Sequence, residues 1–294
     1  DLERVEQDLG SDDSAKWVPE GLRALSGFYS KLGEEATLNR LNEALDRNPE
    51  DSVAYYHRGQ VFIKMELFDQ AYEEFNRSIE LGFSWPGVFA SRGRVSNILD
   101  MPWATAIRDL NAAVDRDPQN AEYYAYRGDV NRSGGILLAA GQDLAQSLLL
   151  DPDLPLAYYF RGLLLHHFSL YEKAIEDFDH AISLDPGLVD AINGRARSNL
   201  QLGLNEQALQ DLELSIDLDP RLAEARLLRA QAYMALDRYG EAVMDLNQTI
   251  KLSPRLSKAY ALRGRALLAL GRDGKSASRA FHPFFIHPQP PPTS

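Results

Sequence analysis

The sequence predicts an all-α solenoid, a stack of helix pairs, from three features that recur in register. Prolines are spaced 34 residues apart, at Pro118, Pro152, Pro186, Pro220 and Pro254. In the same register, small side chains recur in one half of each repeat and alanines in the other. A period of roughly 20–50 residues is typical of repeat architectures, in which no unit buries its apolar stripe alone. We therefore expect one continuous array, although 294 residues would by length suggest about two domains.

We number each repeat so that the recurring proline is position 32. In this numbering, the residue pattern predicts two helices in each repeat. Position 8 is small, at Gly59, Gly128, Gly162, Ala196, Ala230 and Gly264, with Gly93 in the one repeat that has an extra residue. Position 20 holds Ala71, Ala106, Ala140, Ala174, Ala208 and Ala242, and position 24 holds Phe75, Leu110, Leu144, Phe178, Leu212 and Leu246. Positions 4, 7, 8 and 11 share one helical stripe, and positions 20, 23, 24 and 27 share another. The Asp-Pro pair that joins repeats suits a helix boundary, since proline disfavours helix in the residue before it and fits a first turn.

This pattern resembles the tetratricopeptide repeat (TPR) family, whose repeats place an aromatic, a small residue, an alanine, an aromatic and a proline over 34 residues. The resemblance implies a right-handed superhelix of about seven to eight helix-turn-helix repeats. We expect an acidic N-terminal segment over 1–16, the array over 17–280 and a Pro-rich tail over 281–294. The repeats are expected at about 18–51, 52–85, 86–120, 121–154, 155–188, 189–222, 223–256 and 257–280, the last incomplete. The joint at 83–86, which lacks the Asp-Pro pair, is expected to pack least regularly.

Charged residues recur on the core stripes themselves. Position 7 is arginine and position 23 is acidic in six repeats, which gives the pairs Arg58 and Glu74, Arg92 and Asp109, Arg127 and Asp143, Arg161 and Asp177, Arg195 and Asp211, and Arg229 and Asp245. Because unpaired charges on a buried stripe would be strongly unfavourable, we expect one structural ion pair within each repeat. A ladder of ligand-binding arginines is the alternative, and the matched acids argue against it. Arg263 has Arg279 at the matching position, so the pattern fails there.

The resemblance also implies a partner-binding surface, because the first helices of successive TPRs line a concave groove that binds a peptide or a partner's helix. Positions 2, 5, 9 and 12 point into this groove, opposite the core stripe. The candidate binding residues are Tyr56, Gln60, Arg94, Asn97, Asp129, Arg132, Tyr159, His166, Asn193, Arg197, Gln231 and Arg265. Arginines, aromatics and amides suit an adaptable peptide groove, and four arginines in an acidic chain favour a ligand that carries carboxylates. A solvated helix face without a dedicated ligand is the alternative.

Composition excludes several other functions. The net charge of −12 disfavours nucleic-acid binding, and no apolar run is long enough to span a membrane. Without cysteine there is no thiolate nucleophile or Cys-ligated zinc, and the adjacent His166 and His167 cannot form a metal pair at i, i+4. Residues 269–276 fit a permissive Walker A pattern, but a helix precedes them where a P-loop needs a strand. We therefore expect no catalytic residues, metal or cofactor.

The sequence thus predicts a non-catalytic protein-interaction scaffold or adaptor that holds a partner segment in its groove. One alternative is a targeting domain of a larger enzyme, or of a secretion or envelope-assembly complex. Another is self-assembly as a homo-oligomer through the terminal repeats. The expected protein is soluble, in the cytoplasm or a bacterial periplasm, and fold alone does not select a pathway.

Overall fold

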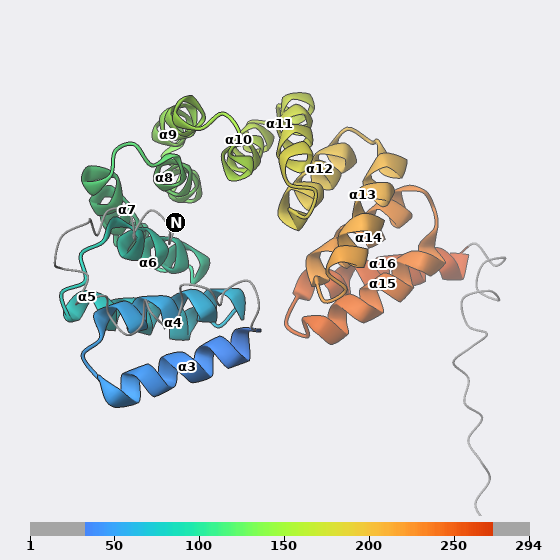
Figure 1. Ribbon diagram of the computed structural model, residues 1–294. Coiled ribbons are helices and arrows are strands. Elements are labelled where there is room, and N and C mark those ends of the chain that lie inside the picture. The colour runs from blue at the N-terminus through green and yellow to red at the C-terminus, as the bar shows by residue number, and fades with distance from the viewer. Residues whose placement is uncertain (1–32, 273–294) are drawn as a thin grey trace, which may run out of the picture. The chain divides into compact units, whose positions relative to one another are not determined.

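The computed structural model describes residues 33–272, which form fourteen helices and no strand within that range (Figure 1). The protein is an all-α helical-repeat solenoid. The expected N-terminal segment, the first helix of the first repeat, Arg279 and the Pro-rich tail lie outside the described residues. The last described helix ends at Arg272.

The chain divides into two compact units, and the boundary between Pro152 and Asp153 falls at an expected repeat junction. The first unit contains α3 (Glu34–Arg47), α4 (Ser52–Lys64), α5 (Phe68–Glu80), α6 (Pro86–Ile98), α7 (Trp103–Arg116), α8 (Ala121–Ser133) and α9 (Leu137–Leu150). The second contains α10 (Pro155–His167), α11 (Tyr171–Leu184), α12 (Val189–Gln201), α13 (Asn205–Leu218), α14 (Ala223–Ala235), α15 (Tyr239–Leu252) and α16 (Ser257–Arg272). Within each unit every helix packs on the next, and first helices also touch one another, such as α4 with α6 and α12 with α14.

The turn between the two helices of a repeat has the same backbone conformation throughout. One residue per turn adopts a left-handed φ between 53° and 77°, at Glu66, Asp100, Gly135, Ser169, Gly203 and Asp237. In the first of these turns the Leu67 amide donates to the Phe62 carbonyl and the Glu66 amide donates to the Ile63 carbonyl. These are the two bonds of a Schellman motif, which ends a helix and satisfies its last carbonyls. Glycine fills only two of these positions, so the turn is held by its hydrogen bonds and packing rather than by glycine alone.

The core of each repeat is centred on the position 24 side chain. The larger this side chain is, the smaller is the residue that lies 16 positions later in the sequence. Phe178 is fully buried, and a Cβ on either Gly162 or Gly194 would lie 2.6 Å from its ring. Where position 24 is leucine, the later residue is large, as in the buried pairs Leu212 with Leu228 and Leu246 with Leu262. The largest position 24 side chain is therefore accommodated by a later residue with little or no side chain, as close packing requires.

Aromatic rings fill the joint at 83–86. The Phe83 and Trp85 rings pack on Tyr56, with ring centroids 5.6 Å and 5.2 Å from that of the tyrosine. Trp85 also covers Gly87, where a Cβ would lie 1.9 Å from the indole. Pro86 then starts α6 as its first helical residue, where a missing amide hydrogen costs nothing.

Candidate functional site

The structure places all six Arg and carboxylate partners in contact, each across the two helices of one repeat. The shortest N to O distances are 2.5–2.7 Å, and both Nε and Nη2 donate to the two carboxylate oxygens. The acidic side chains are only 4–14% exposed, so these pairs are shielded from solvent. Hydrogen bonding to Asp177 raises the pKa of Arg161 against the opposing effect of burial, so the guanidinium stays charged.

Four of these six arginines have a further acceptor in the preceding repeat, always 16 residues earlier, and Arg263 has an acceptor at the same spacing. Nη1 donates to Asn42 from Arg58, to Asn76 from Arg92, to Asn111 from Arg127, to Asp179 from Arg195 and to Asn247 from Arg263, over 2.5–3.1 Å. The same arginines often lie over the position 4 tyrosine, as Arg58 lies over Tyr55 with 5.3 Å between the guanidinium carbon and the ring centroid. Sequence reasoning missed these acceptors, although asparagine recurs at position 25. The guanidinium groups are thus occupied by protein acceptors.

We call the side chains at positions 2, 5, 9 and 12 of the first helices the first-helix face. In the first unit they bond from one first helix to the next. Gln60 Nε2 donates to Ser91 Oγ over 2.6 Å, and Asn97 Nδ2 donates to Asp129 over 3.2 Å. Arg94 lies over the ring of Tyr126, 5.3 Å from its centroid. The polar groups expected to bind a partner therefore also connect neighbouring repeats.

Charges on the face of the first unit are largely compensated within the protein. Arg132 pairs with Asp129 one helical turn earlier, with a shortest N to O distance of 2.6 Å. Burial raises the pKa of Glu122, and the positive charge of Arg94 acts in the opposite direction. The two arginines on this part of the face, Arg94 and Arg132, thus each have an aromatic or acidic neighbour.

In the second unit, a histidine and an arginine of the face are also engaged by the next first helix. His166 Nδ1 lies 2.9 Å from Ser198 Oγ, and Ser198 donates its own hydrogen to the Gly194 carbonyl. His166 must then donate from Nδ1, which leaves Nε2 as an acceptor. Burial lowers the pKa of His166, and the charge of Arg197 lowers it further. Arg197 in turn forms an ion pair with Glu224.

The remaining face residues differ in how far they are engaged. Tyr159 packs on Phe178, and Gln231 donates to the carbonyl of Leu227 on its own helix. Asn193 is 4% exposed, and its Oδ1 has no hydrogen-bond partner in the described part of the chain. Arg265 is exposed and makes no ion pair with another described residue. Of the four arginines expected on this face, Arg265 is the one whose guanidinium is uncommitted within residues 33–272.

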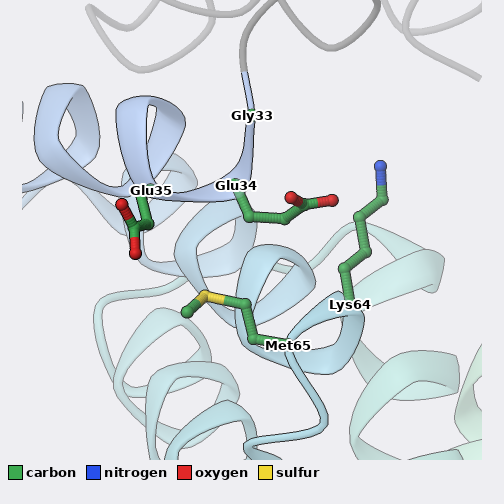
Figure 2. A pocket seen from close by; sticks show the side chains of 5 residues that line it. All are labelled: Gly33, Glu34, Glu35, Lys64 and Met65. Carbon is green, nitrogen blue, oxygen red and sulfur yellow. The ribbon is translucent and has the colours of Figure 1, made fainter.

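Other features of the described chain do not assemble a reactive site. A surface depression lies where α3 starts and α4 ends, lined by Gly33, Glu34, Glu35, Lys64 and Met65 (Figure 2). Its two carboxylates and one amine include no nucleophile paired with a base. No cluster of three or more His, Asp or Glu side chains suited to a metal occurs in residues 33–272. Over the same range, no helix is long and apolar enough to cross a membrane.

Comparisons with known proteins agree with this geometry. Residues 103–155 and 193–255 match a family model described as a tetratricopeptide repeat, and residues 52–81 and 156–188 match a second model of that description. Together these segments cover more than half of the chain. A comparison with curated protein sequences gives no match.

Solved structures share the fold at low sequence identity. A chain in the crystal structure of the APC/C hetero-tetramer Cut9-Hcn1 matches with a TM-score of 0.72 at 21% identity, over 84% of this chain and 48% of that one. The present chain thus spans about half the length of that relative. A tetratricopeptide repeat protein from Parabacteroides merdae ATCC 43184 matches with a TM-score of 0.64 at 18% identity, over 84% and 98% of the two chains.

Proposed function

The chain belongs to the tetratricopeptide repeat family, and on that premise we propose that it is a non-catalytic scaffold that holds a partner segment on its first-helix face. The family is one of protein-interaction scaffolds. The described face offers the chemistry that such a role needs, namely tyrosines, amides and arginines in regular register. The partner we propose is a protein or peptide segment that carries carboxylate groups.

The observation that carries this proposal is the contrast between Arg265 and the other arginines of the face. Arg132 and Arg197 already have carboxylate partners, and Arg94 lies over Tyr126. Arg265, on α16, is exposed without such a partner among the described residues. A guanidinium binds a carboxylate through two parallel hydrogen bonds, which gives both affinity and orientation. We therefore propose that a carboxylate of the partner binds at Arg265, and that the segment continues over α14 toward Gln231.

Peptides selected from a random-sequence display library against the wild-type protein provide the test. We expect enrichment of Asp and Glu in the selected peptides. A charge-assisted hydrogen bond contributes about 1.5–3 kcal/mol, so Arg265→Glu should weaken their binding roughly 10- to 100-fold. Fluorescence anisotropy of one labelled selected peptide measures this change.

Arg255→Glu is the matched control, because Arg255 is also exposed but lies in the α15–α16 connection, off the first-helix face. It introduces the same change of net charge and should leave the affinity within about twofold, since isolated surface charges contribute little. Equal losses for the two variants would show a general charge effect and would refute the site at Arg265.

A further inference from the structure

The outer face of α9 carries two exposed leucines that the same positions of the other described second helices lack. On each second helix, positions 18, 22, 25 and 29 lie opposite the core stripe, and we call them the outer stripe. Position 25 is at the edge of this stripe, where Asn76 and Asp179 also accept hydrogen bonds from an arginine of the next repeat. On α9 they are Leu138, Gln142, Ala145 and Leu149, all exposed. Leu138 is 79% exposed and Leu149 is 75% exposed, the two highest values among the large apolar side chains of the described chain. The two leucines lie on the same face of α9, about three turns apart, so a single partner helix can cover both.

The same positions carry charged residues on the other second helices of the described chain. The stripe of α7 includes Arg108 and Asp115, that of α15 includes Lys251, and those of α5, α11 and α13 are acidic. The outer stripe of α5 is Asp69, Glu73, Asn76 and Glu80, that of α11 is Glu172, Glu176, Asp179 and Ser183, and that of α13 is Glu206, Gln210, Glu213 and Asp217. The stripe of α9 has no charge at all. The one charged residue of that helix, Asp143, points away from it and is held by Arg127 and Asn131. Within the described residues of a chain of net charge −12, α9 is thus the second helix whose outer stripe carries no charge.

The spacing of the stripe is self-complementary. Its intervals of four, three and four residues are those of a coiled-coil seam, which keeps the side chains on one line. When two such helices pack antiparallel about a two-fold axis, Leu138 of one copy meets Leu149 of the other, and Gln142 meets Ala145. Gly141 has no side chain and Ala145 has only a methyl group, so the two backbones can approach closely.

We propose that the outer stripe of α9 is a homodimer contact that takes the α9 of a second copy of this chain. Two copies repel each other at long range because each has a net charge of −12, so a contact that adds no like charges at close range is favoured. Antiparallel pairing of the α13 stripe would instead set Glu206 against Asp217 and Gln210 against Glu213. The α9 stripe avoids this repulsion and covers both leucines at once. This contact is separate from the first-helix face and does not depend on the partner proposed for it.

The dimer should be weak. One helix from each copy buries much less than the roughly 1,200–2,000 Å² of a stable complex. We expect a dissociation constant on the order of 10–100 μM near physiological salt. Raising the salt concentration screens the repulsion between the acidic copies and should tighten the dimer, the opposite of its effect on an ion-paired interface.

Sedimentation equilibrium of the full chain, from about 1 μM to 1 mM, tests this proposal. We expect the wild type to move from monomer to dimer, and Leu138→Glu with Leu149→Glu to raise the dissociation constant by a factor of about 30 or more. Met244→Glu is the control, because Met244 is 68% exposed on the outer stripe of α15 and should not affect the dimer. Mixing the double-Glu variant with the corresponding double-Lys variant should restore association, since each Glu then faces a Lys of the other copy.

Three results would overturn the proposal. One is a wild type that stays monomeric at 1 mM in high salt. Another is a dimer that survives the double-Glu variant, which would favour assembly through the terminal repeats. The third is a double-Glu variant whose melting temperature falls by about 5 °C or more as a monomer, because the stripe would then be covered within one chain.

Discussion

Two packing contacts between successive repeats of the second unit, here called joints, have different residues at equivalent positions. Between α11 and α12, the Phe178 ring lies against Gly194, where a Cβ would come within 2.6 Å of the ring. Between α13 and α14, Leu212 packs with Leu228 in one buried cluster. A large residue meets a small one in the first joint, and two medium residues meet in the second. The comparison shows that the sizes of the two residues at a joint are linked: phenylalanine is paired with a small residue, whereas leucine is paired with a larger one.

The rule extends along the chain as a correlation between positions 24 and 6 of successive repeats. Phenylalanine at position 24 is followed 16 residues later by a small residue, in Phe75 with Ser91 and Phe178 with Gly194. Leucine is followed by a large one, in the pairs Leu41 and His57, Leu110 and Tyr126, Leu144 and Phe160, Leu212 and Leu228, and Leu246 and Leu262. The two solutions are therefore interchangeable only when both residues change together.

Breaking the ion pair that lies between the two joints should have the largest effect. Asp211 is 6% exposed and accepts hydrogen bonds from Arg195 and Asn199. Asp211→Ala should lower the free energy of unfolding by about 3–5 kcal/mol, because it leaves partners without their buried acceptor. Chemical denaturation followed by circular dichroism measures the change. Asp217→Ala, on the exposed side of the same helix, should stay within about 0.5 kcal/mol of the wild type.

Exchanging the residues of the two joints tests this correlation of residue sizes directly. Gly194→Leu should destabilise the protein by about 3 kcal/mol, because its side chain would overlap the buried Phe178 ring. Adding Phe178→Leu rebuilds the joint found at Leu212 and Leu228, and should bring the loss below about 1.5 kcal/mol. Additive effects of the two substitutions in this cycle would contradict the rule.

A histidine makes one joint of the first unit sensitive to pH. His57 is 7% exposed, and burial lowers its pKa to about 4 from a usual 6.5. The folded state therefore favours neutral His57. Its contribution to stability is complete above pH 6.5 and is lost as the pH falls from 6.5 to 4, by about 3 kcal/mol in all.

His57→Leu gives this joint a pair of leucines like Leu212 and Leu228. It should remove the loss of stability that protonation of His57 causes at low pH. Thermal melts between pH 4 and 8 compare the two proteins. The same slope in the wild type and the variant would assign the acid sensitivity to other groups.

The smallest expected effect concerns the turns that lead into the two joints. Gly203 has a φ of 75°, whereas the matching residue of the earlier turn, Ser169, already tolerates a φ of 60° with a side chain. Gly203→Ala should cost about 1 kcal/mol, because alanine disfavours that conformation. Ser169→Ala should change stability by less than about 0.5 kcal/mol, since the backbone strain is present in both. Equal melting temperatures for wild type and Gly203→Ala would show that the turn is not strained.

The fold could be predicted from the sequence because each signal lies within one repeat and recurs in the next repeats. The proline period and the residues at positions 8, 20 and 24 indicate where helices start and which side they bury, and the charge pattern indicates the partner of Arg195 in its own repeat. The second acceptor of that arginine, Asp179, could not be found in this way, since it depends on how one repeat stacks on the next. The correlation between Phe178 and Gly194 likewise involves two repeats. The first-helix face was expected to be open, and its bonds, such as the one from His166 to Ser198, arise only when adjacent helices are placed.

The most direct test of the functional claim is to map where a selected acidic peptide binds. Amide chemical shifts or hydrogen exchange of the full chain, with and without the peptide, report contacts residue by residue. We predict changes concentrated on α14 and α16, around Gln231 and Arg265, with the outer stripes of α11, α13 and α15 unaffected. Changes confined to those outer stripes would contradict the claim that the first-helix face is the binding surface.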